Sequence, residues 1–174
     1  MWVFGYGSLI WRPGFAYEER RWGYVEGWAR RFYQGSADHR GVPEKPGRVV
    51  TLLPAEEART WGVAYRLEGS AAAQVLEALD HREKGGYDRL GLEVRGEGGE
   101  WSLAEVLTYV ATPQNPHFLG AAPVEEMARQ IWEAEGPSGR NRDYVMRLWE
   151  SLNQRGLSDE HVGELVEAMK QWGR

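Results

Sequence analysis

One glutamate, Glu83, stands where a carboxylate can exchange protons with a bound ligand. If a helix that begins near Ser70 continues through it, Val75, Leu79 and Glu83 are spaced i, i+4, i+8 and share one face. That face carries the apolar residues, so the spacing predicts that the carboxylate points toward the core at the end of the helix. Burial raises the pKa of a carboxyl group, and a partly buried glutamate can transfer protons near neutral pH.

The residues after Glu83 favour a functional interpretation. Gly85 and Gly86 follow closely; they are expected to end the helix and to let the backbone approach a ligand. The structural alternative is an ion pair with Arg82, Lys84 or an arginine elsewhere, because a glutamate is rarely buried without a partner. The glycines lead us to expect a carboxylate at the mouth of a pocket.

A second candidate is the turn Tyr6-Gly7-Ser8-Leu9, which follows a short apolar segment. Glycines there allow unusual backbone angles, and consecutive N–H groups in such a turn can bind an anion. The segment is not a phosphate loop, because no Gly-Lys-Ser/Thr follows, and not a nucleophile elbow, because Leu9 replaces the second glycine of Gly-x-Ser-x-Gly. The alternative is a turn with no ligand.

Several chemistries are excluded by composition. The chain has no cysteine, hence no disulfide, thiolate nucleophile or cysteine-based metal site. The histidines, at 39, 81, 117 and 161, lack the spacing of a zinc site, so no metal is expected. His39 is expected to contact a ligand or to order its loop, and His161 to be a surface residue.

The length and net charge of the chain are those of an ordinary globular protein. Its 174 residues predict a single domain over 1–174, and the net charge of −5 disfavours a nucleic-acid partner. No signal peptide or membrane span is recognised, so a soluble cytoplasmic protein is expected. Residues 1–53 carry eight basic and five acidic groups, a net +3 that suits a small anionic ligand or reflects plain surface variation.

The order of predicted elements indicates an α+β fold. Strands are predicted at 2–8, 24–33, 48–53, 60–67, 87–95 and 101–111, helices at 71–82, 124–131, 138–152 and 162–169, and a long loop at 34–47. Ser70 and Ser138 are the predicted N-caps of two of these helices, and Pro123 suits a first turn. Without regular strand–helix alternation, an antiparallel sheet or barrel flanked by helices is favoured over a doubly wound parallel sheet.

The sequence resembles the ChaC-like γ-glutamylcyclotransferases along nearly its whole length and in the same order. The matching segments are Val3–Trp11, Arg30–Phe32, Gln34–Ser36, Asp38–Pro43, Lys45–Leu52, Trp61–Arg66, Arg82–Tyr87, Asn115–Pro116, Leu119–Gly120, Gly136–Asn141 and Asp159–His161. The segments that do not match, including an expected hairpin at 54–60, carry no motif residues. The chain resembles the short, housekeeping branch of the family.

The resemblance implies a compact antiparallel or mixed β-barrel with peripheral helices and the cleavage of glutathione to 5-oxoproline and cysteinylglycine without a cofactor. It assigns Glu83 as the glutamate that takes a proton from the substrate ammonium and returns it to the departing amine. It assigns Tyr6, Gly7, Ser8 and Leu9 to the substrate-binding loop, whose N–H groups hold a carboxylate or the developing oxyanion.

Four further residues are expected to bind substrate. Arg40 and Arg48, around the long loop, could bind the carboxylate of the glycine residue of glutathione. Tyr87 lies four residues past Glu83, and the resemblance places Tyr144 near the substrate. The alternative is that both tyrosines are core residues whose hydroxyls reach ordinary partners. Two alternatives remain: a cyclotransferase for other γ-glutamyl amides, and a non-catalytic binding module on the same fold. The sequence does not distinguish a monomer from a homodimer.

Overall fold

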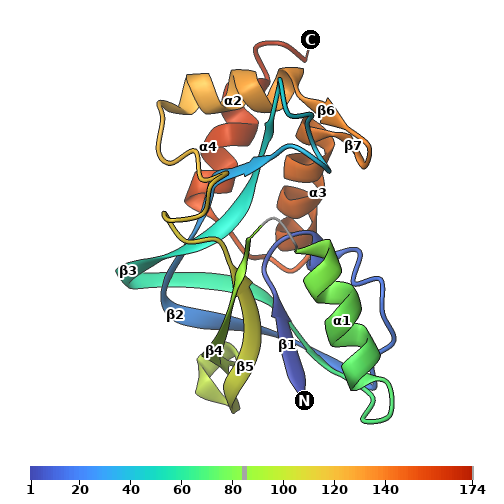
Figure 1. The fold of residues 1–174 in the computed structure, drawn as a ribbon. Coiled ribbons are helices and arrows are strands. Elements are labelled where there is room, and N and C mark those ends of the chain that lie inside the picture. Colours follow the sequence, from blue (N-terminus) through green and yellow to red (C-terminus); the bar gives the residue numbers. More distant parts are fainter. Residues whose placement is uncertain (84–85, 174) are drawn as a thin grey trace. The chain divides into compact units, whose positions relative to one another are not determined.

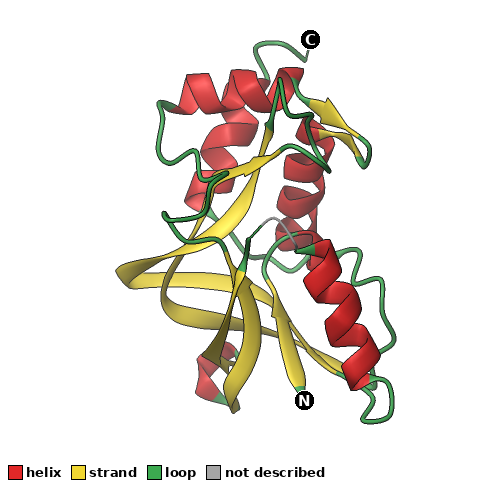
Figure 2. Ribbon diagram, viewed as in Figure 1, coloured by secondary structure: helices red, strands yellow, loops and turns green. Residues whose placement is uncertain are grey.

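The computed structural model describes residues 1–83 and 86–173. Figure 1 labels their helices and strands, and Figure 2 colours them by secondary structure. These residues form two compact units, each of which is described by itself. Unit 1 comprises Met1–Ala29 and Leu52–Pro116, and unit 2 comprises Arg30–Thr51 and His117–Arg174. Two long strands, β2 (Glu19–Ser36) and β3 (Gly47–Arg66), contribute residues to both units.

The strands form a closed mixed barrel in the order β1-β3-β2-β4-β5. Strand β1 (Trp2–Gly5) runs antiparallel to β3 and parallel to β5 (Ser102–Val110), where Val3 pairs with Leu107. Strand β4 (Asp88–Arg95) is antiparallel to both β5 and β2. Closure removes the unpaired strand edges of an open sheet. The predicted α+β barrel with peripheral helices is confirmed.

Helix α1 (Ala72–Arg82) belongs to unit 1 and buries the face that its sequence spacing predicts. It packs on a hydrophobic cluster whose buried members are Val3, Leu9, Leu67, Val75, Leu79 and Tyr109. The predicted cap is wrong, because Ala71 occupies the N-cap position and the Ser70 hydroxyl donates to Glu68 Oε1 at 3.0 Å. The helix is therefore positioned by its apolar face.

Strand β3 corrects the prediction of two strands joined by a hairpin. It is a single strand from Gly47 to Arg66, within which Glu57 has a φ of 62°. The polar residues between Pro54 and Arg59 are largely exposed. Their composition therefore reflects solvent exposure and a local irregularity, and the chain does not reverse there.

Unit 2 contains three helices that pack on one another: α2 (Val124–Glu133), α3 (Asn141–Asn153) and α4 (Glu160–Met169). A short hairpin, β6 (Glu135–Gly136) with β7 (Gly139–Arg140), separates α2 from α3. Ser138 lies in its turn and Arg140 occupies the N-cap position of α3, so the predicted Ser138 cap is wrong. The predicted loop is shorter than expected, because β2 extends to Ser36 and β3 begins at Gly47.

The start of α4 is fixed by buried polar contacts that the sequence does not reveal. Asp159 caps the helix by accepting from the Val162 N–H at 3.1 Å, and it also pairs with the buried Arg30 at 2.8 Å. His161 is buried, and its Nε2 accepts the Phe32 N–H at 3.0 Å. The expectation that His161 is a surface residue is therefore wrong, since its ring supplies an acceptor to β2.

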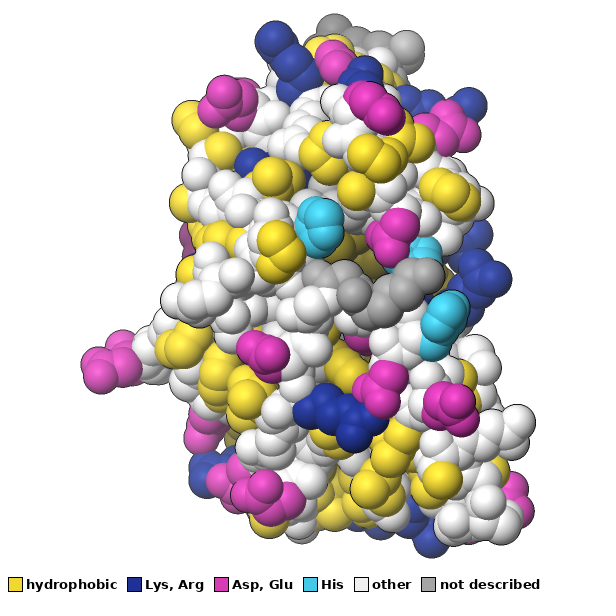
Figure 3. All heavy atoms as spheres, viewed as in Figure 1, with side chains coloured by type: hydrophobic (Ala, Val, Ile, Leu, Met, Phe, Trp, Pro, Cys, Tyr) yellow, Lys and Arg dark blue, Asp and Glu magenta, His cyan; other side chains and the backbone are white. Residues whose placement is uncertain are grey.

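None of the described helices combines the length and the hydropathy of a membrane-spanning segment. On the face drawn in Figure 3, acidic and basic side chains are interspersed over the surface.

Candidate active site

Glu83 occupies the C-cap position of α1. Its N–H bonds the Leu79 carbonyl at 2.8 Å, so it continues the register that places Val75 and Leu79 against the core. Its side chain is 21% exposed. The carboxylate is therefore partly withdrawn from water yet reachable, which is the environment that the i, i+4, i+8 spacing predicts.

The chain beyond Glu83 is anchored at Gly86. Lys84 and Gly85 lie outside the described residues, so their predicted parts in an ion pair and in ending the helix stay predictions. Gly86 has a φ of +89°, a conformation that favours glycine, and its carbonyl accepts from Asn115 Nδ2 at 2.8 Å. Asn115 is buried, and the sequence does not indicate this contact because the two residues are 29 positions apart.

The Tyr6–Leu9 turn follows β1 directly and enters a short 3₁₀ helix, Ser8–Ile10. The Gly7 carbonyl accepts from the Ile10 N–H at 3.0 Å, and the Ser8 carbonyl from the Arg12 N–H at 2.8 Å. Gly7 has a φ of −130°, outside the left-handed region, so a positive φ is not what requires glycine there. The close approach is at Gly5, where an added Cβ would lie 2.5 Å from Leu9 Cβ.

Two buried tyrosines fix this turn to the barrel. The Tyr6 hydroxyl donates to the Tyr109 carbonyl at 2.7 Å, and the Tyr65 hydroxyl donates to the Leu9 carbonyl at 2.7 Å. Burial raises the pKa of Tyr65 to about 12, so it remains a donor at physiological pH. The side chain of Tyr6 is thus engaged with the fold, which leaves its backbone as the part suited to binding a ligand.

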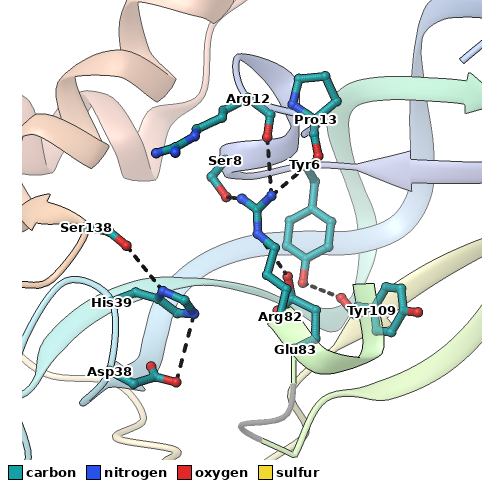
Figure 4. Close-up of polar contacts among 10 residues, drawn as sticks. All are labelled: Tyr6, Ser8, Arg12, Pro13, Asp38, His39, Arg82, Glu83, Tyr109 and Ser138. Carbon is teal, nitrogen blue, oxygen red and sulfur yellow. Dashed lines mark hydrogen bonds and ion pairs between the residues drawn. The ribbon is translucent and has the colours of Figure 1, made fainter. Parts of the chain in front are cut away.

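Arg82 connects the two sequence-predicted features (Figure 4). Its Nη2 donates to Ser8 Oγ at 2.6 Å, and its Nε lies 3.9 Å from Glu83 Oε1. The second distance is longer than a hydrogen bond, so Arg82 forms only a loose ion pair with Glu83. Unit 1 therefore brings Glu83 and the Tyr6–Leu9 turn together through one guanidinium group.

Tyr87 also lies in unit 1, immediately before β4 and not within it. Its N–H bonds the Glu83 carbonyl at 3.4 Å, and its half-buried ring packs against the cluster beneath α1. The position is close in sequence and in space to Glu83. The ring nevertheless has the packing of a core residue on one side, so the core alternative is supported for part of the side chain.

Arg40 and Tyr144 are neighbours within unit 2. The Arg40 guanidinium lies 5.7 Å from the centre of the Tyr144 ring, and its Nη1 donates to the Arg140 carbonyl at 3.1 Å. Tyr144 is buried and meets Phe32 edge to face at 5.9 Å. These contacts hold Arg40 and Tyr144 next to each other within unit 2.

Arg48 is built into the interior of unit 2. Its guanidinium donates to Gln130 Oε1 at 2.7 Å, to the Phe32 carbonyl at 3.0 Å and to the Gly120 carbonyl at 2.8 Å. Burial lowers its pKa from the ordinary arginine value. Three protein acceptors for one buried guanidinium indicate a structural role, and its expected contact with a substrate carboxylate has no support from this geometry.

His39 orders the loop that it belongs to. Its Nδ1 lies 3.2 Å from Ser138 Oγ, and its Nε2 lies 3.9 Å from Asp38 Oδ2 (Figure 4); the side chains of His39 and Asp38 are about half exposed. The carboxylate is too distant to orient the ring by a hydrogen bond, so the three residues do not form a hydrolytic triad. Over residues 1–83 and 86–173, no cluster of three acidic or histidine side chains could hold a metal ion.

Comparison with known proteins extends the match to the whole chain. The family model described as ChaC-like protein matches residues 1–172. The human glutathione-specific γ-glutamylcyclotransferase 1 is 46% identical over 173 residues, which cover 97% of this chain and 78% of the human protein. The glutathione-specific γ-glutamylcyclotransferase of Schizosaccharomyces pombe is 38% identical, with 98% of this chain and 93% of that protein covered.

The fold agrees with the sequence comparison. The crystal structure of a γ-glutamylcyclotransferase specific to glutathione from yeast superposes with a TM-score of 0.93 at 30% identity, covering 99% of this chain and 96% of the yeast chain. Because the family model matches residues 1–172 and the human relative is 46% identical over 97% of this chain, the chain belongs to the ChaC-like family.

Proposed function

We propose that this protein is a glutathione-specific γ-glutamylcyclotransferase that releases 5-oxoproline and cysteinylglycine. The observation that carries the proposal is the nearly full-length match to enzymes of that name from human and fission yeast. Glu83, at the end of α1 and linked through Arg82 to the Tyr6–Leu9 turn, supplies a suitable group for the chemistry.

The reaction requires no nucleophile from the protein. The α-amine nitrogen of the γ-glutamyl group attacks its own side-chain amide carbonyl, the new C–N bond closes a five-membered ring, and the bond to the cysteine nitrogen breaks. Glu83 takes a proton from the α-ammonium group and returns it to the departing amine. Holding the substrate folded supplies the orientation that an intramolecular attack needs.

The turn is proposed to hold the substrate. Because Tyr6, Tyr65 and Arg82 fix its side chains and carbonyls to unit 1, its backbone is ordered before a ligand arrives. Ordered N–H groups stabilise a carboxylate or a developing oxyanion without reorganising during the reaction. In this proposal Tyr6, Gly7, Ser8 and Leu9 act chiefly through the backbone and the Ser8 hydroxyl.

The residues outside the turn are proposed to have different roles. Tyr87 and the Arg40–Tyr144 pair remain proposed substrate contacts, with Arg40 directed to the distal carboxylate of glutathione. Arg48 is better explained as a structural residue of unit 2, because its guanidinium already has three acceptors. A cytoplasmic location, a single domain and membership of the short branch stay predictions.

The first test measures the products. Purified protein incubated with reduced glutathione is expected to release equal amounts of 5-oxoproline and cysteinylglycine, and EDTA is expected to leave the rate unchanged because the substrate carries its own nucleophile. Comparing kcat/KM for glutathione and γ-glutamyl-alanine then tests specificity. Equal values would favour a cyclotransferase for γ-glutamyl amides in general, and glutathione binding without products would favour the binding module.

A further inference from the structure

Arg82 is the last residue of α1, and its guanidinium reaches three parts of the segment that follows β1. Nη2 donates to Ser8 Oγ at 2.6 Å, while Nη1 lies 3.3 Å from the Arg12 carbonyl and 3.5 Å from the Pro13 carbonyl (Figure 4). The side chain is 28% exposed, and all its partners belong to unit 1. One side chain therefore ties the end of α1 to the first residue of the 3₁₀ helix and to the segment that follows this helix.

The bond to Ser8 has a chemical consequence for the hydroxyl group. A guanidinium can only donate, so Ser8 Oγ must be the acceptor of the 2.6 Å bond. With a lone pair committed to a cation, the hydroxyl keeps its own proton for donation, and charge-assisted bonds are the stronger kind. Ser8 is thereby prepared to donate to an anion, such as the α-carboxylate of a γ-glutamyl group.

We propose that Arg82 is a positioning residue of the reaction: it sets the Ser8 hydroxyl as a donor and holds the Tyr6–Leu9 turn at a fixed place beside Glu83. This inference rests on the proposed function. Arg82 touches no reacting atom; it acts through Ser8 and through the backbone of the turn. The planar guanidinium has donors at fixed angles, which a lysine ammonium cannot reproduce toward the same three acceptors.

Two simpler roles give different expectations. A basic side chain in the last turn of a helix stabilises it through the helix dipole, and a loose pair with Glu83 adds charge compensation. Either role needs only a positive charge, so lysine would replace arginine without loss. Neither role links the effect of Arg82 to the Ser8 hydroxyl.

The test compares R82M and R82K with R95M. Arg95 is also ion-paired within unit 1, to Glu26 and Glu93, but contacts neither the turn nor Glu83. With glutathione, we expect R82M to raise KM and lower kcat, with kcat/KM at least tenfold lower, and R82K to recover less than half of the loss. R95M should remain within twofold of the wild type. Full recovery in R82K would overturn the proposal in favour of a role for charge alone.

A double-mutant cycle with S8A identifies the route of the effect. If Arg82 acts through Ser8, R82M should raise KM less than twofold further in the S8A background, whereas a purely structural role predicts that the two effects multiply. Multiplying effects would remove Ser8 from the proposal and so overturn it. The melting temperature of each variant separates lost stability from lost positioning.

A measurement independent of turnover keeps the inference distinct from the proposed function. Hydrogen exchange should be faster at the Ile10 and Arg12 amides, which close the turn, in R82M and R82K but not in R95M. If the wild type failed to cleave glutathione, the proposed function would fall while this exchange difference still tested the positioning of the turn. Equal exchange in all variants would show that Arg82 does not hold it.

Discussion

At the scale of single residues, the arrangement of the side chains around Glu83 depends on contacts with residues far away in the sequence. The spacing of Val75, Leu79 and Glu83 predicts the face of the carboxylate, because helix periodicity is a local property. The contact of Arg82 with Ser8 spans 74 residues, and no local pattern indicates it. The sequence therefore identifies the candidate glutamate and the turn, while their connection requires the fold.

Glu83 is expected to be essential for turnover and unimportant for folding. Replacing Glu83 with Gln keeps its size and removes its basic group, so kcat should fall by about 100-fold or more, a usual contribution of general acid–base catalysis. Its melting temperature should hold or rise, since a half-buried charge has been removed. E77Q, an exposed glutamate on the same helix, is the control and should match the wild type. Near-normal turnover in E83Q would assign Glu83 a structural role.

At the scale of elements, apolar periodicity predicts the helices and their bounds to within three residues, but two predicted N-caps are wrong. Ser70 and Ser138 have the right residue type for caps, yet Ala71 and Arg140 occupy the cap positions. Packing of the buried face decides where a helix lies, and a serine nearby then finds another partner. The same limit applies to β3, which is continuous where a hairpin was predicted. Exposed polar residues within a strand have the composition of a turn, and the sequence alone does not distinguish the two.

The backbone conformation at position 86 should depend on glycine. An alanine there would adopt the positive φ of +89° at a cost of about 1–2 kcal/mol, and its Cβ would lie 2.8 Å from Asn115 Nδ2. We expect G86A to lower kcat/KM at least tenfold by displacing the segment after Glu83. G98A provides the control, since Gly98 has a φ of +65° with no atom within 4 Å of an added Cβ. Equal activity in the two variants would show that only stability depends on Gly86.

The buried histidine of α4 should make unit 2 sensitive to acid. Burial, with Arg31 next, lowers the pKa of His161 from 6.5 to about 4. Between these values the unfolded chain binds a proton that the folded chain does not, so the free energy of unfolding falls as pH drops from about 6.5 to about 4, by on the order of 3 kcal/mol. Above pH 6.5 this contribution is fully present.

Denaturant titrations across that range test the expectation. Substituting His161 with Gln keeps an acceptor for the Phe32 N–H and removes the titrating ring, so the pH dependence should flatten by that amount. The exposed His81, replaced by Gln, should leave the curve unchanged. A wild-type curve parallel to that of H161Q would mean that His161 titrates normally in the folded protein.

At the scale of the whole molecule, the sequence predicts a single domain and the structure divides into two compact units. Strands β2 and β3 are each continuous and supply residues to both units. A strand that loses order in one unit is expected to fray into the other, so the units should unfold together. Chain length predicts the number of domains, and neither length nor composition contains information on this internal division.

Calorimetry measures that cooperativity. We expect one thermal transition whose calorimetric enthalpy equals its van't Hoff enthalpy, as for a two-state domain. R95M, which perturbs only unit 1, should shift the entire transition. Two resolved transitions, or an enthalpy ratio well above one, would establish two independently folding units.

Three anchors around the Tyr6–Leu9 turn end on main-chain oxygens, whereas the bond from Arg82 to Ser8 ends on a side-chain hydroxyl. Tyr6 bonds the carbonyl of Tyr109, Tyr65 that of Leu9, and Arg82 that of Arg12. A carbonyl is present whatever side chain the codon specifies, so inherited substitutions at these acceptor positions leave each anchor in place. A single base change can remove one of these three anchors only at its donor position. The lineage of this protein can therefore vary the surroundings of its turn while the turn itself stays fixed.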